Sequence, residues 1–442
     1  MPLTSLLLSS GSNAHGQLSN GTSEDVHKFA PCSFLGYPTG TLPPGTRRVV
    51  HITSGANHTL ALLETEAEGK RHLEIWGCGD GSSGQLGSVL QARRTASVFW
   101  PIDLSLKNAG LDNYSYKLVC ASWETTYIVL SCEGKADVFI SMGADDFGDL
   151  GVEGMNKGRG KQAILPFHIV SFDHLTLEGV PVRKDSITVE SLVSGQHHVV
   201  VQLRGTLVNG KEVTFVAGWG TSRHGQLGNL VSPGGGPTPF LTKPAVISID
   251  DSHDRIIAHA LGSQHTVFLY ASGKVSGLGS SRRGQLQGLE NVKHATGLGC
   301  TWNGTYLLVN DGQGDTRVIA AGSYMHGQLG RELPVGTSGL AGTLKPSAVE
   351  FPGDTQSVKS IACGTEHVLA ICTSKGTDRS PDVAVWGWGW NEHGNLGTGS
   401  TNNIFVPVKI WTGAEEDLIP VRVWGGSGTS WIYATHDADW VQ

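Results

Sequence analysis

Short runs of alternating or wholly apolar residues recur along the chain, and polar turns separate them. The runs HTLALLE from His58 and HLEIWGCG from His72 are two of them, with the turn TEAEGKR between. A hydrophobic period of two is typical of β-strands, and no segment shows a sustained helical period of 3.6 residues. The pattern therefore predicts an all-β protein built from small antiparallel sheets.

A first repeat consists of glycine, four residues, glycine, a polar residue and leucine, and it occurs seven times. Its copies begin at Gly11, Gly79, Gly143, Gly220, Gly279, Gly322 and Gly389. A phosphate-binding loop would need G-x4-G-K-[ST] between a strand and a helix. Here Gln, Asp or Asn follows the second glycine, and we expect no helix after it. The glycines are therefore interpreted as the end of one strand and the reversal after it, where positive φ or a missing Cβ is useful.

A second repeat lies between the copies of the first. It is a small residue followed two or three positions later by His or Thr and then by an apolar run, as in SGANHTLALL from Ser54. It also occurs seven times, and three copies are irregular. ASWETT carries Trp123 and Thr125, CTWNGT carries Trp302 and Gly304, and the last copy carries Thr429 and Trp431.

Seven copies of two repeats predict seven units of the same kind. One four-stranded sheet cannot bury both its faces alone, so the units must stack, and stacking around an axis gives a seven-bladed β-propeller. We name the strands of a blade A to D. The chain begins in a C strand (SLLLSSG) and ends in a B strand (TSWIYA), so the last blade is closed by N- and C-terminal strands.

The propeller is expected to be a single domain over residues 1–442. Longer connections are interpreted as surface-loop insertions. They lie near residues 88–117, 152–190, 229–255 and 331–357.

Composition and charge narrow the functional classes. The net charge of -7 argues against a positive electrostatic potential that would attract nucleic acid, so no direct DNA binding is expected. The seven cysteines are scattered without C-x-x-C spacing, which indicates neither a zinc site nor a disulfide framework. We find no signal peptide or membrane span. The expectation is a protein of the cytoplasm and nucleus, with no cofactor and no enzymatic activity.

The alternation of G-x4-G-Q-L with the CGxxHTLAL type of repeat resembles the regulator of chromosome condensation family over nearly the whole chain. The irregular blades, with GCGDGSSGQL and WGWGWNEHGN, further resemble the fungal alpha-tubulin suppressor, or killer-toxin-insensitivity, branch of that family. That resemblance implies a non-enzymatic heterodimer with the small CSL zinc-finger protein of diphthamide biosynthesis, and an association with the Elongator complex. It implies support of diphthamide formation on elongation factor 2 and of wobble-uridine modification in tRNA. The longer connections of this chain depart from that branch.

Topology predicts where a partner would bind. In an A-B-C-D blade the A–B turn and the C–D loop lie at the same end, and loops on a rigid scaffold commonly carry function. Tryptophan and arginine are enriched among interface hot spots. The candidate partner-binding residues are Trp123, Trp302, Trp390, Glu392, His393, Arg223, Arg282 and Arg283. For the three loop tryptophans, interface and internal packing remain equally open.

Other candidate residues receive structural interpretations. Four tryptophans that lie within strands are expected to pack between blades: Trp76, Trp219, Trp386 and Trp424. Four histidines recur at one repeat position and are expected to make a blade-building hydrogen bond: His58, His198, His265 and His367. The histidines before the second glycine belong to different blades and are not expected to hold a metal. Asp145 and Asp146 are interpreted as solvated loop charges.

Three functions stay open. The first is the adaptor described above. The second is a guanine-nucleotide exchange factor for a Ran-like small GTPase, although the chain begins within its first strand and lacks a basic N-terminal tail. The third is a general scaffold or ligase-linked propeller.

Overall fold

The computed structural model describes most of the chain. The described residues are 5–153, 166–229, 238–247, 254–310, 312, 314–333, 344–353, 357–374, 382–413 and 417–436. The chain divides into two compact units. Unit 1 holds Met1–Ala14, Asn20–Leu42 and Asp251–Gln442, and unit 2 holds His15–Ser19 and Pro43–Asp250. The expectation of one domain over residues 1–442 stays a prediction.

Unit 2 contains three four-stranded antiparallel sheets, each in the strand order A-B-C-D. Blade 1 is β3 (Thr46–Ser54), β4 (His58–Ala67), β5 (Lys70–Asp80) and β6 (Thr95–Pro101). Blade 2 is β7 (Ser115–Ala121), β8 (Thr125–Ser131), β9 (Val138–Gly143) and β10 (His168–Val170). Blade 3 is β13 (Thr188–Ser194), β14 (His198–Thr206), β15 (Glu212–Thr221) and β16 (Phe240–Val246). A small hairpin, β11 (Thr176–Leu177) and β12 (Val180–Pro181), lies between blades 2 and 3 in the chain.

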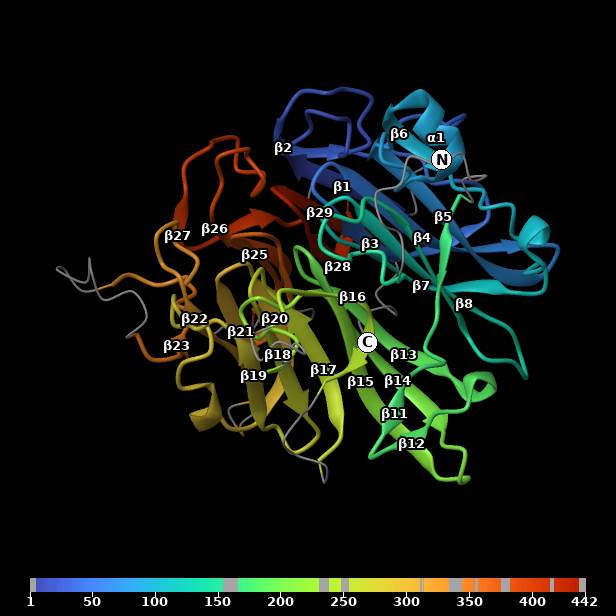
Figure 1. Cartoon of the computed structure of the whole chain (residues 1–442). Coiled ribbons are helices and arrows are strands. Elements are labelled where there is room, and N and C mark those ends of the chain that lie inside the picture. The colour runs from blue at the N-terminus through green and yellow to red at the C-terminus, as the bar shows by residue number, and fades with distance from the viewer. Residues whose placement is uncertain are drawn as a thin grey trace. The chain divides into compact units, whose positions relative to one another are not determined.

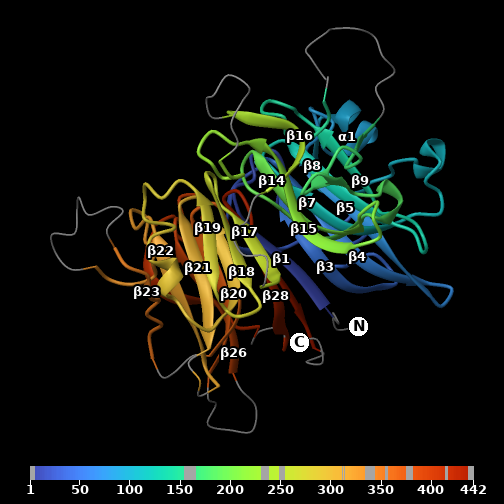
Figure 2. The same cartoon turned by 60° about the horizontal axis from the view of Figure 1, so that its bottom comes forward.

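Unit 1 contains the other four sheets. Blade 4 is β17 (Ile256–Leu261), β18 (His265–Tyr270) and β19 (Val275–Gly279). Blade 5 is β20 (Ala295–Thr301), β21 (Gly304–Asn310), β22 (Thr316–Gly322) and β23 (Ser347–Ala348). Blade 6 is β24 (Ser357–Cys363), β25 (His367–Ser374), β26 (Asp382–Gly389) and β27 (Ile404–Trp411). Figure 2 shows blades 4 and 5 as neighbouring sheets.

Blade 7 joins the two ends of the chain. Its A and B strands are β28 (Ile419–Gly425) and β29 (Thr429–Thr435), and its C and D strands are β1 (Ser5–Gly11) and β2 (Val26–Pro31). β1 pairs with β29 from Ser5 opposite Thr435 to Gly11 opposite Thr429 (Figure 1). The seven sheets confirm the predicted seven-bladed β-propeller, with the last blade closed by the terminal strands.

Apolar side chains of neighbouring blades meet to form the core. Between blades 2 and 3, the fully buried Trp219 indole stands edge-on to the rings of Tyr127 and Phe139, with centroid distances of 6.0 and 5.2 Å. Trp76 and Trp386 are also buried, while Trp424 is half-buried. Packing of the strand tryptophans is thus confirmed for Trp76, Trp219 and Trp386.

The predicted insertions contain regular structure. The segments 88–117, 152–190, 229–255 and 331–357 each hold the D strand of a blade, namely β6, β10, β16 and β23. A D strand is expected after each glycine loop, for example over residues 96–104, where β6 lies. The rest of the four segments stays a prediction as surface-loop insertions. Residues 154–165, 230–237, 248–253, 334–343 and 354–356 of these segments lie outside the described residues.

One helix also corrects an expectation. The helix α1 (Gly87–Arg93) follows the second glycine loop of the chain, where we expected no helix. It has seven residues and buries Gly87 and Leu90, and Leu90 packs with Leu86 and Ile102 in the core between blades 1 and 2. So short a helix has too few turns for a 3.6-residue pattern to appear in the sequence.

Candidate functional site

The A–B turns and C–D loops touch one another within each unit, as topology predicts. In blade 5 the first glycine of the repeat, Gly322, has φ of +121°, and an added Cβ would collide with the carbonyl oxygen of Asn303 in the A–B turn. In blade 6, Gly389 has φ of +103° and lies in the same way against Glu366. Glycine is needed there both for positive φ and for the close approach of turn and loop.

Backbone hydrogen bonds connect the A–B turns of successive blades. In unit 2, the Ala56 N–H donates to the Trp123 carbonyl at 2.7 Å, and the Trp123 N–H donates to the Gln196 carbonyl at 3.2 Å. In unit 1, Ser263 donates to Trp302, and Trp302 donates to Thr365. The irregular residues Trp123 and Trp302 therefore occupy regular backbone positions, and both side chains are half-buried.

The recurring histidines link neighbouring blades through their side chains. Nε2 of His58 lies 3.1 Å from Thr126 Oγ1, that of His265 lies 3.3 Å from Thr305 Oγ1, and that of His367 lies 3.0 Å from Ser430 Oγ. Each partner is on the B strand of the next blade. Burial lowers the pKa of all three imidazoles to about 4. The predicted blade-building hydrogen bond is confirmed at these three positions.

Two of the three irregular blades, 2 and 5, share a frame of hydrogen bonds. In blade 2, the Tyr127 hydroxyl and the Trp219 indole N–H both donate to the backbone carbonyl of Asp149, at 2.8 and 2.9 Å. In blade 5, Tyr306 and Trp388 donate in the same way to the carbonyl of Gln328, at 2.9 and 3.0 Å. The tyrosine comes from the B strand of the irregular blade and the tryptophan from the C strand of the next blade. Each frame holds its C–D loop against the neighbouring blade.

The side chain at the frame position differs between the two units. The Gln328 side chain accepts a hydrogen bond from the His326 backbone N–H with Oε1. It donates from Nε2 to Glu366 Oε2 at 3.0 Å. Glu366 also accepts from the Asn303 amide at 2.5 Å. Burial raises the pKa of the Glu366 carboxyl, and the two amide donors oppose that rise. In unit 1 this half-buried carboxylate therefore has partners from within the chain.

In unit 2 an aspartate occupies that position. Asp149 Oδ2 accepts from the Phe147 N–H at 3.0 Å, so it caps the loop as the glutamine does. Its other oxygen, Oδ1, lies 3.4 Å from Nδ1 of His197, a contact without hydrogen-bond geometry. The rings of Phe147 and Trp123 lie 4.7 and 6.0 Å from the His197 ring. We call Trp123, Glu124, Phe147, Asp149 and His197 the blade 2–3 site.

The third loop tryptophan has a different setting, at the C–D loop of blade 6. The Trp390 indole stands edge-on to the His393 imidazole at 5.3 Å. His393 Nδ1 lies 2.6 Å from Asp25 Oδ2, which belongs to the connection between β1 and β2 of blade 7. Glu392, between them in sequence, is exposed. The structure thus brings Trp390 and His393 together and adds Asp25, which the sequence analysis did not name.

The candidate arginines are exposed in C–D loops. Arg282 and Arg283 follow β19 in unit 1, and Arg223 follows β15 in unit 2. Among the described residues none of these three side chains forms an ion pair or a hydrogen bond, although Arg283 lies close enough to Glu366 to oppose the rise in its pKa. Met325, in the next C–D loop of unit 1, is 59% exposed. Unit 1 therefore presents cations and an exposed apolar side chain on successive loops.

Sequence reasoning did not name Phe147, Asp149, Asp25 or Met325. A signal was available for Asp149, because aspartate replaces the glutamine that follows the second glycine in most copies of the repeat. No comparable signal existed for Asp25, whose contact with His393 joins residues far apart in sequence.

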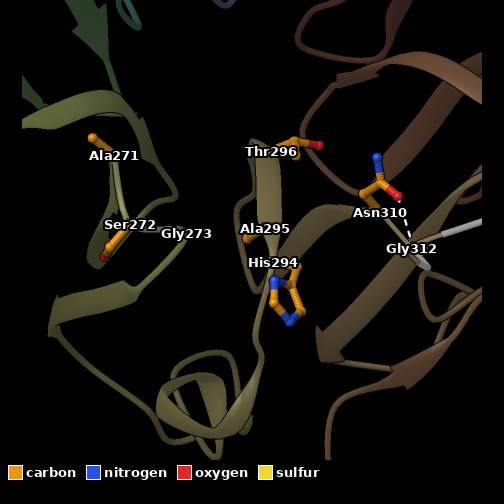
Figure 3. Close-up of a pocket in the computed structure, with 8 residues that line it drawn as sticks. All are labelled: Ala271, Ser272, Gly273, His294, Ala295, Thr296, Asn310 and Gly312. Carbon is orange, nitrogen blue, oxygen red and sulfur yellow. Dashed lines mark hydrogen bonds between the residues drawn. The ribbon is translucent and has the colours of Figure 1, made fainter. Parts of the chain in front are cut away.

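A cavity of about 470 Å³ lies elsewhere, at the end of blades 4 and 5 opposite the A–B turns. Figure 3 shows the β18–β19 turn at Ser272 on one side, His294 and Thr296 of blade 5 in the middle, and Asn310 on the other side. Most of the lining residues are exposed and none is an acid, lysine or arginine. It lacks the convergent polar groups of a ligand site.

In the described part of the chain, no three His, Cys, Asp or Glu side chains are grouped so that they could hold a metal ion. No described helix has the length and apolar character that would span a membrane.

Comparison with known proteins identifies the repeat. The regulator of chromosome condensation (RCC1) repeat profile matches residues 6–62, 315–371 and 384–429, and a second RCC1 profile matches residues 358–395. The secretion-regulating guanine nucleotide exchange factor of Mus musculus is 26% identical over 92% of this chain and 78% of its own length. An RCC1 repeat-containing protein of Schizosaccharomyces pombe is 23% identical over 97% of this chain and 98% of its own.

A solved structure shows the same fold. Prp20p of Saccharomyces cerevisiae superimposes with a TM-score of 0.66 at 18% identity, covering 99% of this chain and 93% of its own. The crystal structure of Prp20p was characterised together with its binding to Gsp1p and histones.

Proposed function

Because this chain carries RCC1 repeats and has the seven-bladed propeller fold of that family, we propose that it is a non-enzymatic adaptor. We propose as its partner the small CSL zinc-finger protein of diphthamide biosynthesis. Through this heterodimer the chain supports diphthamide formation on elongation factor 2 and Elongator-dependent modification of wobble uridine in tRNA, in the cytoplasm and nucleus. RCC1-type propellers serve as exchange factors or adaptors, and function has to be argued from the site.

The observation that supports an adaptor is the character of the loops in unit 1. Arg282 and Arg283 are exposed without ion pairs, and Met325 is exposed in the next C–D loop. Trp390 and His393 form a half-buried aromatic pair in the C–D loop of blade 6. Arginine, methionine and tryptophan are enriched in protein interfaces, whereas a catalytic site would need convergent titratable groups.

The experiment is purification of the tagged protein from its own cells at about 150 mM salt, followed by mass spectrometry. We expect stoichiometric recovery of a CSL zinc-finger protein. Trp390→Ala and the double variant Arg282→Ala/Arg283→Ala should lose most of it, because both remove side chains of the C–D loops in unit 1. A matched control is Lys107→Ala/Lys211→Ala, which removes two exposed cations outside the A–B turns and C–D loops. Absence of the zinc-finger protein from the wild-type eluate contradicts the proposal.

A guanine-nucleotide exchange factor for a Ran-like GTPase is the second candidate. It is supported by the exchange-factor relative from Mus musculus and by the fold shared with Prp20p. The test is release of fluorescent GDP from a purified Ran-like GTPase. An adaptor leaves the rate of GDP release at its intrinsic value, whereas an increase of a hundredfold or more with catalytic amounts of the propeller would establish exchange activity instead.

A further inference from the structure

We propose that the blade 2–3 site binds a cationic side chain, lysine or arginine, from a segment of a partner protein. The cation lies on the Trp123 indole and donates a hydrogen bond to the His197 imidazole, above the Asp149 carboxylate. This inference does not rest on the adaptor function proposed above, because it concerns different residues and unit 2 alone.

The first support is the buried carboxylate of Asp149. The residue is 3% exposed, and Oδ1 has no hydrogen-bond partner among the described residues. A buried polar atom in a folded protein normally has a partner, because leaving it unsatisfied costs about 1–3 kcal/mol and more for a charge. The backbone of Asp149 cannot relax away, since Tyr127 and Trp219 both hold its carbonyl. The site therefore holds a buried carboxylate whose Oδ1 faces the His197 imidazole at 3.4 Å without hydrogen-bond geometry.

The second support is the homologous frame in unit 1. There the half-buried Glu366 carboxylate receives donors from Gln328 and Asn303. Neither donor has a counterpart in unit 2, where Asp149 replaces the glutamine and Glu124 occupies the turn position of Asn303. Unit 1 thus surrounds a turn carboxylate, Glu366, with two amide donors, whereas unit 2 has its carboxylate in the loop, at Asp149, and an imidazole, His197, at the turn position of Glu366. A positive charge supplied from outside would complement the carboxylate of unit 2.

The third support is the arrangement of rings above Asp149. Nδ1 of His197 is the buried nitrogen and faces Asp149, so a proton held on Nδ1 leaves Nε2 as an acceptor. Trp123 and Phe147 flank the imidazole and are half-buried. An aromatic face beside a carboxylate suits a cation, since the ring quadrupole attracts positive charge.

The fourth support is local charge. The three segments that form the site are Ser122–Thr125, Gly143–Leu150 and Gly195–His198, and together they contain Glu124, Asp145, Asp146 and Asp149 but no lysine or arginine. Burial raises the pKa of Asp145, and its backbone hydrogen bond from Leu150 opposes that rise. An acidic and aromatic surface without its own cation favours a basic partner segment over an acidic one.

The test uses the full chain and a fluorescein-labelled peptide of alternating lysine and glycine, with binding measured by fluorescence anisotropy at about 50 mM salt. The decisive variant is Asp149→Asn, which removes the charge but keeps an oxygen to accept the Phe147 N–H. Asparagine suits this repeat position, because the chain already carries Asn395 there in blade 6. We expect at least tenfold weaker binding by Asp149→Asn and by Trp123→Leu.

Two controls separate a specific site from general attraction. Asp112→Asn removes an exposed acid outside the A–B turns and C–D loops and should bind within twofold of the wild type. The same peptide with acetylated lysines should lose binding, because only the ammonium charge has changed. If Asp149→Asn melts at the wild-type temperature yet binds the lysine peptide as tightly as the wild type, or if the acetylated peptide binds equally well, the proposal is wrong.

Discussion

At the scale of single residues, the recurring histidine ties each blade to the next. The His367 imidazole bonds Ser430 of blade 7 and packs so closely on Gly364 that an added Cβ there would collide with the ring. This explains why a small residue precedes the histidine in the repeat. Because the imidazole is buried, it is held neutral, with its pKa lowered to about 4.

Acid should therefore destabilise the protein in a defined range. The pKa values of His58, His265 and His367 are lowered from 6.5 to about 4 by burial, so the unfolded chain binds protons that the folded chain does not. The stability that the protein gains from burying these histidines in their neutral form is complete above pH 6.5. It is lost as the pH falls from 6.5 to 4. Each histidine accounts for roughly 3 kcal/mol at the acid end. Urea unfolding at pH 7.5, 6.0 and 5.0 measures the slope.

The variant His367→Gln isolates one of these contributions. It should be less stable than the wild type at pH 7.5, because the fit to Ser430 and Gly364 is lost, yet its stability should fall less steeply toward pH 5. The exposed His72→Gln serves as control and should follow the wild-type curve. A variant curve parallel to that of the wild type would show that burial of His367 is not the cause.

At the scale of elements, the paired frames of blades 2 and 5 replace the histidine link. Thr125 and Gly304 stand where blades 1, 3, 4 and 6 carry histidine, and the tyrosine and tryptophan hydrogen bonds to Asp149 and Gln328 connect the blades instead. The C–D loop carbonyl receives two donors in each frame. Irregular repeats are thus sites of an alternative blade contact rather than defects.

Removing one donor from a frame tests this element. Tyr306→Phe deletes the hydroxyl that donates to the buried Gln328 carbonyl, and we expect a loss of about 1–2 kcal/mol in the free energy of unfolding. Tyr116→Phe is a matched control, because its hydroxyl makes a long bond of 3.4 Å to the Ile102 carbonyl, and it should change stability by less than about 0.5 kcal/mol. Equal losses of unfolding free energy in the two variants would show that the frame contributes no more to stability than an ordinary tyrosine hydrogen bond.

At the scale of the whole molecule, the two ends of the chain depend on each other. β1 supplies the C strand of blade 7 and pairs with β29 along its whole length. Leu6 and Leu8 of β1 pack in one core with Ile432 and Ala434 of β29 and with Leu369 of blade 6. Without β1, the edge of β29 would be open to pairing with other chains.

Weakening this closure should therefore lower stability strongly. Leu8→Ala removes a side chain that is 4% exposed, and we expect a loss of about 2–5 kcal/mol with a lower melting temperature and greater aggregation on heating. Leu35→Ala, at a side chain that is 40% exposed, should change stability little. Scanning calorimetry with light scattering measures both effects. A wild-type melting temperature for Leu8→Ala would contradict closure by the terminal strands.

The sequence alone determined the architecture, since the period of two, the seven copies of each repeat and the strand types at the chain ends are local features. The role of the recurring histidine followed in the same way, because His58, His265 and His367 share one repeat position. The helix α1 escaped prediction, because a single short helix carries little hydrophobic pattern.

Only the tertiary structure decided which candidates come together. The pairing of His393 with Asp25, and the blade 2–3 site of Trp123, Phe147, Asp149 and His197, join side chains from different blades. Asp149 and Gln328 occupy the same position of the repeat in blades 2 and 5. Whether that change leaves a carboxylate without a donor depends on the residue that the next blade places beside it, and that neighbour is set by blade packing rather than by local sequence.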